Sequence, residues 1–333
     1  MLKKRITYFD VAKGLLISIV VLHHYLLYAH SIYGIQNKTI GFLFDYQKVL
    51  LCFFMPGFFF ITGCCSNFNK KFNVFLWGNF KTLIVPSVFF TLLTRLLAGE
   101  YNHLHSEIIR STIVDIVLFG GHYWFLQALF IAKIIYWVIN KQFSSKFAIF
   151  FFCLIIALGG NYLNQYDIIP NFWFHRHAMD LCLYIALGCI LKNHLGNSFF
   201  RTSTVIYIFT IVLLLVFNGH IPYLTRSFSY SLPLYPLHTV LSVTGSILIL
   251  YLSKIINSNS ILEYLGKASL VIYVCHIPFS IQPILKLSKS LLGDSGVVSS
   301  IIIILLEILI TLAICALFYR LINTKYLKWI IGK

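Results

Sequence analysis

The 333-residue sequence contains few charged residues: only 11% are Asp, Glu, Lys or Arg, whereas 59% are hydrophobic and the mean hydropathy is +0.84. A water-soluble fold of this length leaves a large part of its surface exposed and cannot bury so much apolar side chain. The composition therefore predicts a polytopic membrane protein. Its polar connections, at 99–113, 162–176 and 219–235, are short, so a single membrane domain is expected to fill residues 1–333.

Several chemical signatures are missing as well. The eight cysteines all lie in apolar stretches, with no C-x-x-C pair and no Cys/His spacing typical of a metal site. There is no H-E-x-x-H sequence, and no phosphate loop, nucleophile elbow or dinucleotide-binding glycine pattern in a strand-turn-helix context. We therefore expect no metal and no permanently bound cofactor.

Long apolar runs supply the predicted architecture, an all-α membrane bundle. A run of about 20 residues crosses the roughly 30 Å hydrocarbon core as a helix. Seven such runs lie at 11–30, 41–63, 77–98, 114–139, 236–255, 266–285 and 297–321, with weaker ones at 147–163, 177–192 and 203–218. The sequence thus predicts about ten spans. Pro56 and Pro86 interrupt two of them and are expected to free backbone carbonyls one turn earlier.

The distribution of basic residues predicts the orientation. With alternating spans and a cytoplasmic start, 17 of the 26 Lys and Arg residues fall on the inner side and 8 on the outer, with Lys133 inside a span. This bias places both termini in the cytoplasm. The expected location of the chain is the cytoplasmic (inner) membrane. The net charge of +16 is scattered beside apolar runs, which indicates lipid headgroups rather than nucleic acid as its partner. A basic start before an apolar run also fits a signal peptide, but its length and ionisable residues favour a retained helix.

The first apolar run, YFDVAKGLLISIVVLHHYLLYAH, carries groups that lipid repels. On a helix, Lys13 and His24 share a face about 16 Å apart along the axis, and Asp10 lies one turn from Lys13, within pairing distance. An ionisable residue at the depth of His24 is expected to face the bundle interior or a wet cavity and to be functional. For His23, which points about 80° away from Lys13, an interhelical hydrogen bond is favoured, with a place in the pocket as the alternative.

The segment FDVAKGLLISIVVLHH resembles the first helix of the integral-membrane acyltransferase 3 family, in which an Asp is followed three residues later by Arg or Lys and, after ten more, by His. Asp10, Lys13 and His24 match that pattern. Further similar segments follow in order along nearly the whole chain: FFMPGFFFITG, KTLIVPSVFF, WFLQALFIAKII, LYIALGCILK and LEYLGKASLVIYVCH. The chain resembles especially the branch of fucose 4-O-acetylase-like sugar O-acyltransferases.

The resemblance implies transfer of an acyl group, usually acetyl from cytoplasmic acetyl-CoA, to a hydroxyl of a cell-envelope or exported saccharide. His24 would be the general base or would carry the acyl group itself; the sequence leaves both routes open. Lys13 and Lys81 would hold the phosphates of coenzyme A, and Asp10 would anchor Lys13. Many members carry two spaced basic residues before the third-span proline, whereas this chain offers only Lys81 there, with Lys70 and Lys71 farther back.

Other candidate residues have weaker support. His122, Tyr123, Trp124 and His276 are candidate pocket residues and donors to the developing oxyanion, although Trp124 also fits an interfacial aromatic and His276 an interhelical donor. Outer residues such as Asp167, Trp173 and Arg176 are candidate acceptor contacts or solvated loop residues.

The principal alternative function is a saccharide exporter or flippase without acyl-transfer chemistry, and a third is a scaffold or sensor subunit. Exporters often show repeated halves, and we find no internal repeat. A scaffold would leave the intramembrane Lys13 and His24 unexplained. The sequence leaves several points open: the sugar and its hydroxyl position, acetyl or succinyl as the acyl group, a lipid-linked or a polymeric acceptor, and the oligomeric state.

Overall fold

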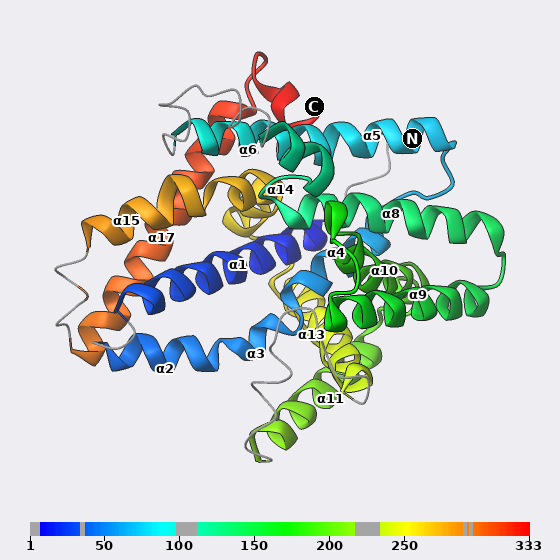
Figure 1. The fold of residues 1–333 in the computed structure, drawn as a ribbon. Coiled ribbons are helices and arrows are strands. Elements are labelled where there is room, and N and C mark those ends of the chain that lie inside the picture. Colours follow the sequence, from blue (N-terminus) through cyan, green and yellow to red (C-terminus); the bar gives the residue numbers. More distant parts are fainter. Residues whose placement is uncertain (1–6, 34–36, 98–111, 217–233, 289–291, 293–295) are drawn as a thin grey trace. The chain divides into compact units, whose positions relative to one another are not determined.

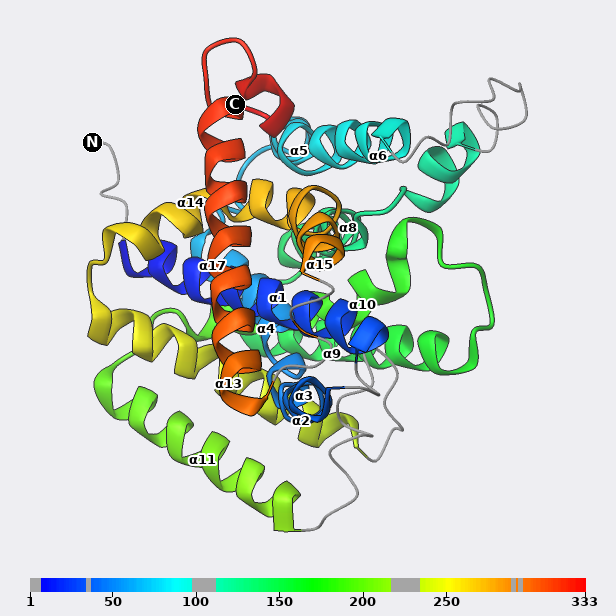
Figure 2. The same cartoon turned by 90° about the vertical axis from the view of Figure 1, so that its left-hand side faces the viewer.

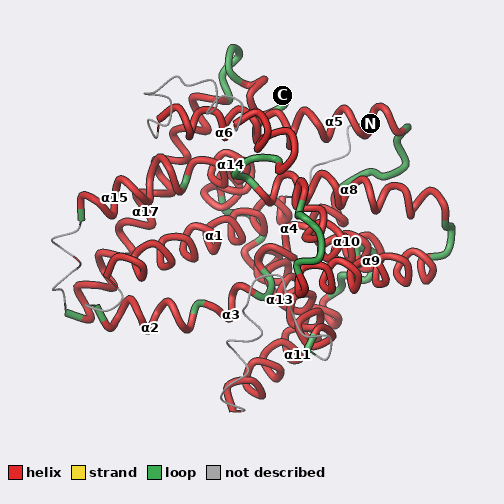
Figure 3. The backbone as a smooth tube through the Cα atoms, viewed as in Figure 1, coloured by secondary structure: helices red, strands yellow, loops and turns green. Residues whose placement is uncertain are grey.

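A computed structural model describes residues 7–33, 37–97, 112–216, 234–288, 292 and 296–333. This part of the chain consists of helices and loops, without strands (Figure 3). It divides into two compact units, each assembled from separate stretches of sequence. Unit 1 comprises Met1–Phe58, Gly196–Ser227 and His238–Leu321, and unit 2 comprises Phe59–Leu195, Phe228–Leu237 and Ile322–Lys333.

Helices occupy all ten predicted ranges. Five of those ranges hold one long helix each: α9 (Lys146–Tyr166), α10 (His175–Leu191), α11 (Asn197–Val216), α13 (Tyr235–Ile256) and α17 (Val297–Ile322). The first apolar run forms α1 (Thr7–Tyr33). Within the described residues, six helices are long and apolar enough to cross a membrane, or seven when one bent pair is counted. The protein is therefore a multi-pass membrane protein, while the count of ten and the cytoplasmic termini stay predictions.

The run at 41–63 is not the single continuous helix that its hydropathy predicts. It is divided into α2 (Lys38–Tyr46), α3 (Lys48–Leu51) and α4 (Phe54–Cys65). Starting α4 at Phe54 places Pro56 in the first turn, where its missing N–H is tolerated. The Cys52 carbonyl, four residues before Pro56, accepts a hydrogen bond from Ser242 Oγ of α13 at 2.5 Å. The carbonyl that Pro56 frees is thus satisfied by a neighbouring helix, as expected.

Pro86 has a corresponding effect on the third range. There α5 (Phe72–Asn79) continues into a π-helical turn, η1 (Phe80–Ile84), and then into α6 (Val85–Leu97). A proline cannot donate to the carbonyl four residues earlier, and a π-helical turn accommodates the interrupted hydrogen-bond ladder. The predicted disturbance in the turn before Pro86 is confirmed.

In unit 2, α10 packs against both α8 (Trp124–Gln142) and α9 (Figure 1). A π-helical turn, η2 (Asp115–Phe119), precedes α8, and between them Gly120 and Gly121 adopt positive φ angles of 81° and 77°. Gln127 Nε2 donates to the Gly120 carbonyl, which fixes this turn to α8. Two short helices, η3 (Phe172–Phe174) and η5 (Lys328–Ile331), complete the unit.

Unit 1 is built on the crossing of α1 with α14 (Ser260–Cys275). Gly14 lies against the backbone of Leu262, and Gly266 lies against the backbone of Asp10, so that a Cβ on either glycine would collide with main-chain atoms. These glycines let the two helices approach to backbone contact. In Figure 2, α17 runs across α1, to which it is joined by a side-chain hydrogen bond between Tyr25 and Glu307.

Candidate functional site

The Asp10–Lys13 pair lies at this helix crossing. Lys13 Nζ is 2.7 Å from Asp10 Oδ1, one helical turn away, as the spacing predicts. Asp10 is buried, whereas Lys13 is only half-buried. The side chain of Lys13 is 28% exposed, so its ammonium group can contact an anion as well as Asp10.

His24 lies about three turns farther along α1 and faces a second histidine, His276. The centroids of the two rings are 4.8 Å apart and their planes are inclined by 68°. His276 ends α14, where the chain bends by 72° into η4 (Ile277–Ile281) and α15 (Gln282–Leu287). Pro278 has no N–H to donate to the carbonyl four residues earlier, and Ile281 N donates to the His276 carbonyl, five residues earlier, at 2.8 Å, which closes a π-helical turn. The bend therefore has an identifiable cause in the sequence.

Hydrogen bonds to backbone carbonyls define the tautomers of both rings. His24 Nδ1 lies 2.9 Å from the Val20 carbonyl oxygen, and His276 Nδ1 lies 3.0 Å and 2.8 Å from those of Ile272 and Tyr273. A carbonyl oxygen only accepts, so Nδ1 carries the hydrogen in each ring. In the neutral form of each ring, Nε2 then carries the lone pair. The arrangement offers two neutral imidazole bases side by side.

His276 is almost completely buried, with 1% of its surface exposed, and within the described residues its Nε2 atom has no hydrogen-bond partner. A buried acceptor without a partner costs about 1–3 kcal/mol. A buried polar atom without a partner calls for an explanation, such as a catalytic function or a bound water. His24, in contrast, is only partly buried, so its ring is the accessible member of the pair.

His23 has the interhelical hydrogen bond that we expected for it. Its Nδ1 atom lies 3.0 Å from Gln47 Oε1, at the junction of α2 and α3. Its ring lies 5.0 Å from that of His24 and 5.7 Å from that of Phe54. His23 therefore packs beside the pair and ties α1 to the neighbouring segment.

The other candidate residues belong to unit 2, so the structure does not group them with the histidine pair. Lys70 and Lys71 are exposed between α4 and α5, and Lys81 lies in η1, with Nζ 5.0 Å above the centroid of the Trp77 ring. All three are accessible cations. Within the described residues, the structure records no ion pair for these three side chains, so an anionic ligand can bind them without displacing an acid.

His122, Tyr123 and Trp124 each contact residues of unit 2. Arg95 Nε donates to His122 Nε2 at 3.2 Å, and the same guanidinium binds Asp115 and Thr112. Tyr123 OH is 3.0 Å from Thr94 Oγ1, and the Trp124 ring lies 5.5 Å from that of His177. Arg176, one of the outer candidates, pairs with Asp167 at 2.6 Å.

The structure also shows buried acids that we did not single out from the sequence. In unit 1, Tyr25 OH donates to Glu307 of α17, and in unit 2 Tyr235 OH donates to Asp180 of α10 at 2.7 Å. Both carboxylates lie within apolar helices and are buried. A carboxylate inside an apolar run is itself a signal of a buried polar contact, and it is visible in the sequence.

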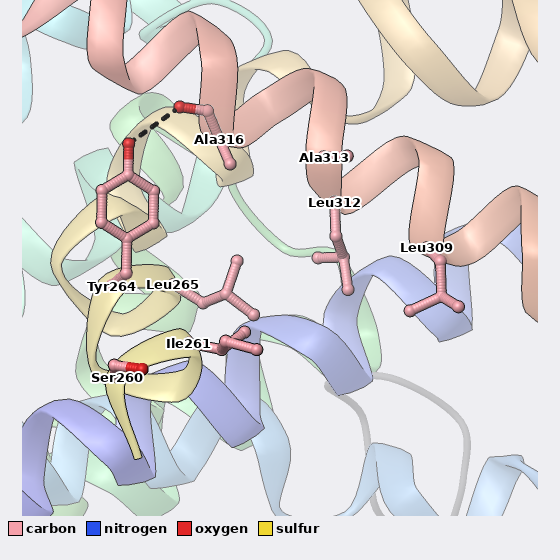
Figure 4. Close-up of a pocket in the computed structure, with 8 residues that line it drawn as sticks. All are labelled: Ser260, Ile261, Tyr264, Leu265, Leu309, Leu312, Ala313 and Ala316. Carbon is pink, nitrogen blue, oxygen red and sulfur yellow. Dashed lines mark hydrogen bonds between the residues drawn. The ribbon is translucent and has the colours of Figure 1, made fainter. Parts of the chain in front are cut away.

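Unit 1 also contains a groove with a mostly apolar lining. It has a volume of about 470 Å³ and lies between α14 and α17 (Figure 4). Its lining is Ser260, Ile261, Tyr264, Leu265, Leu309, Leu312, Ala313 and Ala316. Tyr264 OH donates to the Ala316 carbonyl at 3.1 Å across it. Without a histidine, a carboxylate or an amine in its walls, this groove offers no base for acyl transfer.

Comparisons with known proteins identify the family of this chain. The acyltransferase domain family matches residues 6–320. The chain therefore belongs to the acyltransferase 3 family and is a membrane acyltransferase. It is also similar to the nodulation protein NolL of Mesorhizobium japonicum (strain LMG 29417 / CECT 9101 / MAFF 303099), with 33% identity over 132 residues. That match covers 38% of this chain and 34% of NolL. No solved structure matches the chain.

Proposed function

We propose that this protein transfers an acetyl group from cytoplasmic acetyl-CoA to a hydroxyl group of a cell-envelope or exported saccharide. The family supports acyl transfer, and the observation that carries the proposal is the His24–His276 pair, with ring centroids 4.8 Å apart and, within the described residues, no hydrogen-bond partner for His276 Nε2. A sugar hydroxyl is a poor nucleophile at neutral pH and needs a base within hydrogen-bond reach. His24, the accessible ring of the pair, is that base.

The reaction is balanced without any further co-reactant. The hydroxyl oxygen attacks the thioester carbonyl carbon while His24 Nε2 takes the hydroxyl proton. The new C–O bond forms, the C–S bond breaks, and the proton on Nε2 passes to the sulfur of the leaving coenzyme A. His24 returns to its neutral form. In the alternative route the acyl group would first bond to a histidine nitrogen.

The basic side chains indicate where the acyl donor, coenzyme A with its acetyl group, would bind. Lys13, held by Asp10 at 2.7 Å, would bind an anionic group of coenzyme A at the inner end of α1. Lys70, Lys71 and Lys81 are exposed and would bind phosphate groups of the same ligand. With both termini in the cytoplasm and the protein in the cytoplasmic membrane, as the basic residues predict, these lysines lie on the donor side.

The proposal is tested with the purified protein in lipid nanodiscs, acetyl-labelled acetyl-CoA and the deacylated envelope polysaccharide of the producing strain. We expect alkali-labile label on the polysaccharide. In cells, deleting the gene should remove ester-linked acetyl while the polymer stays on the surface. Loss of surface polymer with unchanged acetylation of the remaining polymer would instead support the exporter and overturn the proposal.

A further inference from the structure

The acyl-transfer reaction as written requires one imidazole base, yet the structure contains two. His276 comes from a different helix, 252 residues after His24, and it is the more deeply buried of the two. Its Nδ1 atom contacts two carbonyl oxygens at the end of α14, at 3.0 Å and 2.8 Å. Those contacts stabilise the helix end. They leave unexplained why its Nε2 atom is kept without a partner beside His24.

The tautomers suggest an answer. With a hydrogen on Nδ1 in both rings, the two Nε2 atoms are both acceptors, and two acceptors cannot hydrogen-bond to each other. Addition of one proton changes this, because the protonated Nε2 atom becomes a donor and the other stays an acceptor. A second proton would place two like charges about 5 Å apart in a buried site, which is unfavourable. The pair is therefore arranged to hold one proton.

We propose that His276 is a positioning residue for His24: its Nε2 atom accepts a hydrogen bond from the imidazolium that forms when His24 deprotonates the acceptor hydroxyl. This inference rests on the proposed function. The proton moves from the hydroxyl oxygen to His24 Nε2, is shared there with His276 Nε2, and leaves on the thiol of coenzyme A. His276 neither gains nor loses a proton over the whole cycle. The charge-assisted hydrogen bond stabilises the transition state and holds the ring in place.

Three substitutions separate this function from helix capping. In His276→Asn the amide nitrogen occupies the place of Nδ1 and still donates to the carbonyls of Ile272 and Tyr273, but nothing replaces Nε2. In His276→Gln the longer side chain brings an amide to the place of Nε2, and its oxygen accepts a hydrogen bond although it cannot be protonated. Ser280→Ala is the matched control, because Ser280 is fully buried one turn later, and its hydroxyl has no partner within the described residues.

The assay is steady-state acetyl transfer in nanodiscs, with acetyl-CoA and deacylated polysaccharide, together with thermal unfolding of each variant. We expect kcat to fall about 100-fold in His276→Asn and about 10-fold in His276→Gln, with KM for acetyl-CoA unchanged, within the range of acid–base effects. Ser280→Ala should keep wild-type kcat. If His276→Asn does not fold, the His276→Gln variant alone decides, by its kcat relative to wild type.

The inference is overturned if the foldable variants keep kcat within twofold of wild type, if Asn and Gln lower kcat equally, or if Ser280→Ala lowers it as much as they do. An effect on KM alone would also overturn it, because a hydrogen bond made only to the imidazolium acts in the transition state. An active wild type with fully active His276 variants refutes only this inference. An inactive wild type refutes the proposed function.

Discussion

Tyr25 of α1 donates its hydroxyl hydrogen to the carboxylate of Glu307 on α17, and both side chains are buried. Tyr25 directly follows His24, so a contact that fixes Tyr25 also fixes the rotation of α1 and the direction of the His24 ring. The long apolar helix α17 thus places an acid against the helix that carries the proposed base.

This contact predicts thermodynamic coupling. Tyr25→Phe and Glu307→Leu should each lower the free energy of unfolding by about 1–3 kcal/mol, because each leaves the other polar group buried without its partner. The double variant should lose less than the sum of the two. Thermal or denaturant unfolding in one detergent measures all four proteins. Additive losses would show that the two side chains do not stabilise each other.

A second prediction concerns the close approach of α1 and α14. Gly14→Ala should destabilise the protein by about 1–3 kcal/mol, because the added methyl group meets the backbone of Leu262, which cannot rotate away. Gly78→Ala is the matched control in another helix, since nothing lies within 4 Å of its added Cβ. That control should be neutral or slightly stabilising. Equal unfolding temperatures for the two variants would contradict the crossing described here.

A third prediction concerns the donor site. Lys13→Ala should raise KM for acetyl-CoA about tenfold, equivalent to about 1.4 kcal/mol of lost binding, with a smaller change in kcat. Lys267→Ala is the control, because Lys267 also pairs with an acid on its own helix, Glu263 at 3.6 Å. It should keep the wild-type KM. An unchanged KM in Lys13→Ala would remove Lys13 from the donor site.

The sequence predicts the positions of the helices well, because each long apolar run requires a helix to satisfy its backbone in lipid. The sequence also predicts the interruption before Pro86, because a proline has no N–H to donate within the helix. The division of 41–63 is harder to predict, since it depends on Ser242, nearly 200 residues away, to satisfy the Cys52 carbonyl. A hydropathy value averaged over many residues does not detect such a break in the helix.

From the sequence, only the part of the candidate site that lies on α1 can be predicted. The spacing of Asp10, Lys13 and His24 along α1 is a local property, and the ion pair expected from it is present at 2.7 Å. The contact of His24 with His276 joins residues far apart in the chain and depends on the packing of α14 against α1, so no local pattern indicates it. Glu307 can be recognised in the sequence, because it is an acid inside an apolar run. Its partner, Tyr25, cannot be recognised in this way.

The most direct test of the central claim is the acetyl-transfer rate of His24→Ala in nanodiscs, measured with acetyl-CoA and deacylated polysaccharide beside His23→Ala. We predict that His24→Ala loses at least about 100-fold in kcat while it stays folded, since a positioned base contributes about 10²–10⁴-fold. His23→Ala, which removes the hydrogen bond to Gln47, should lose much less. A His24→Ala protein with a kcat within twofold of wild type would contradict the account.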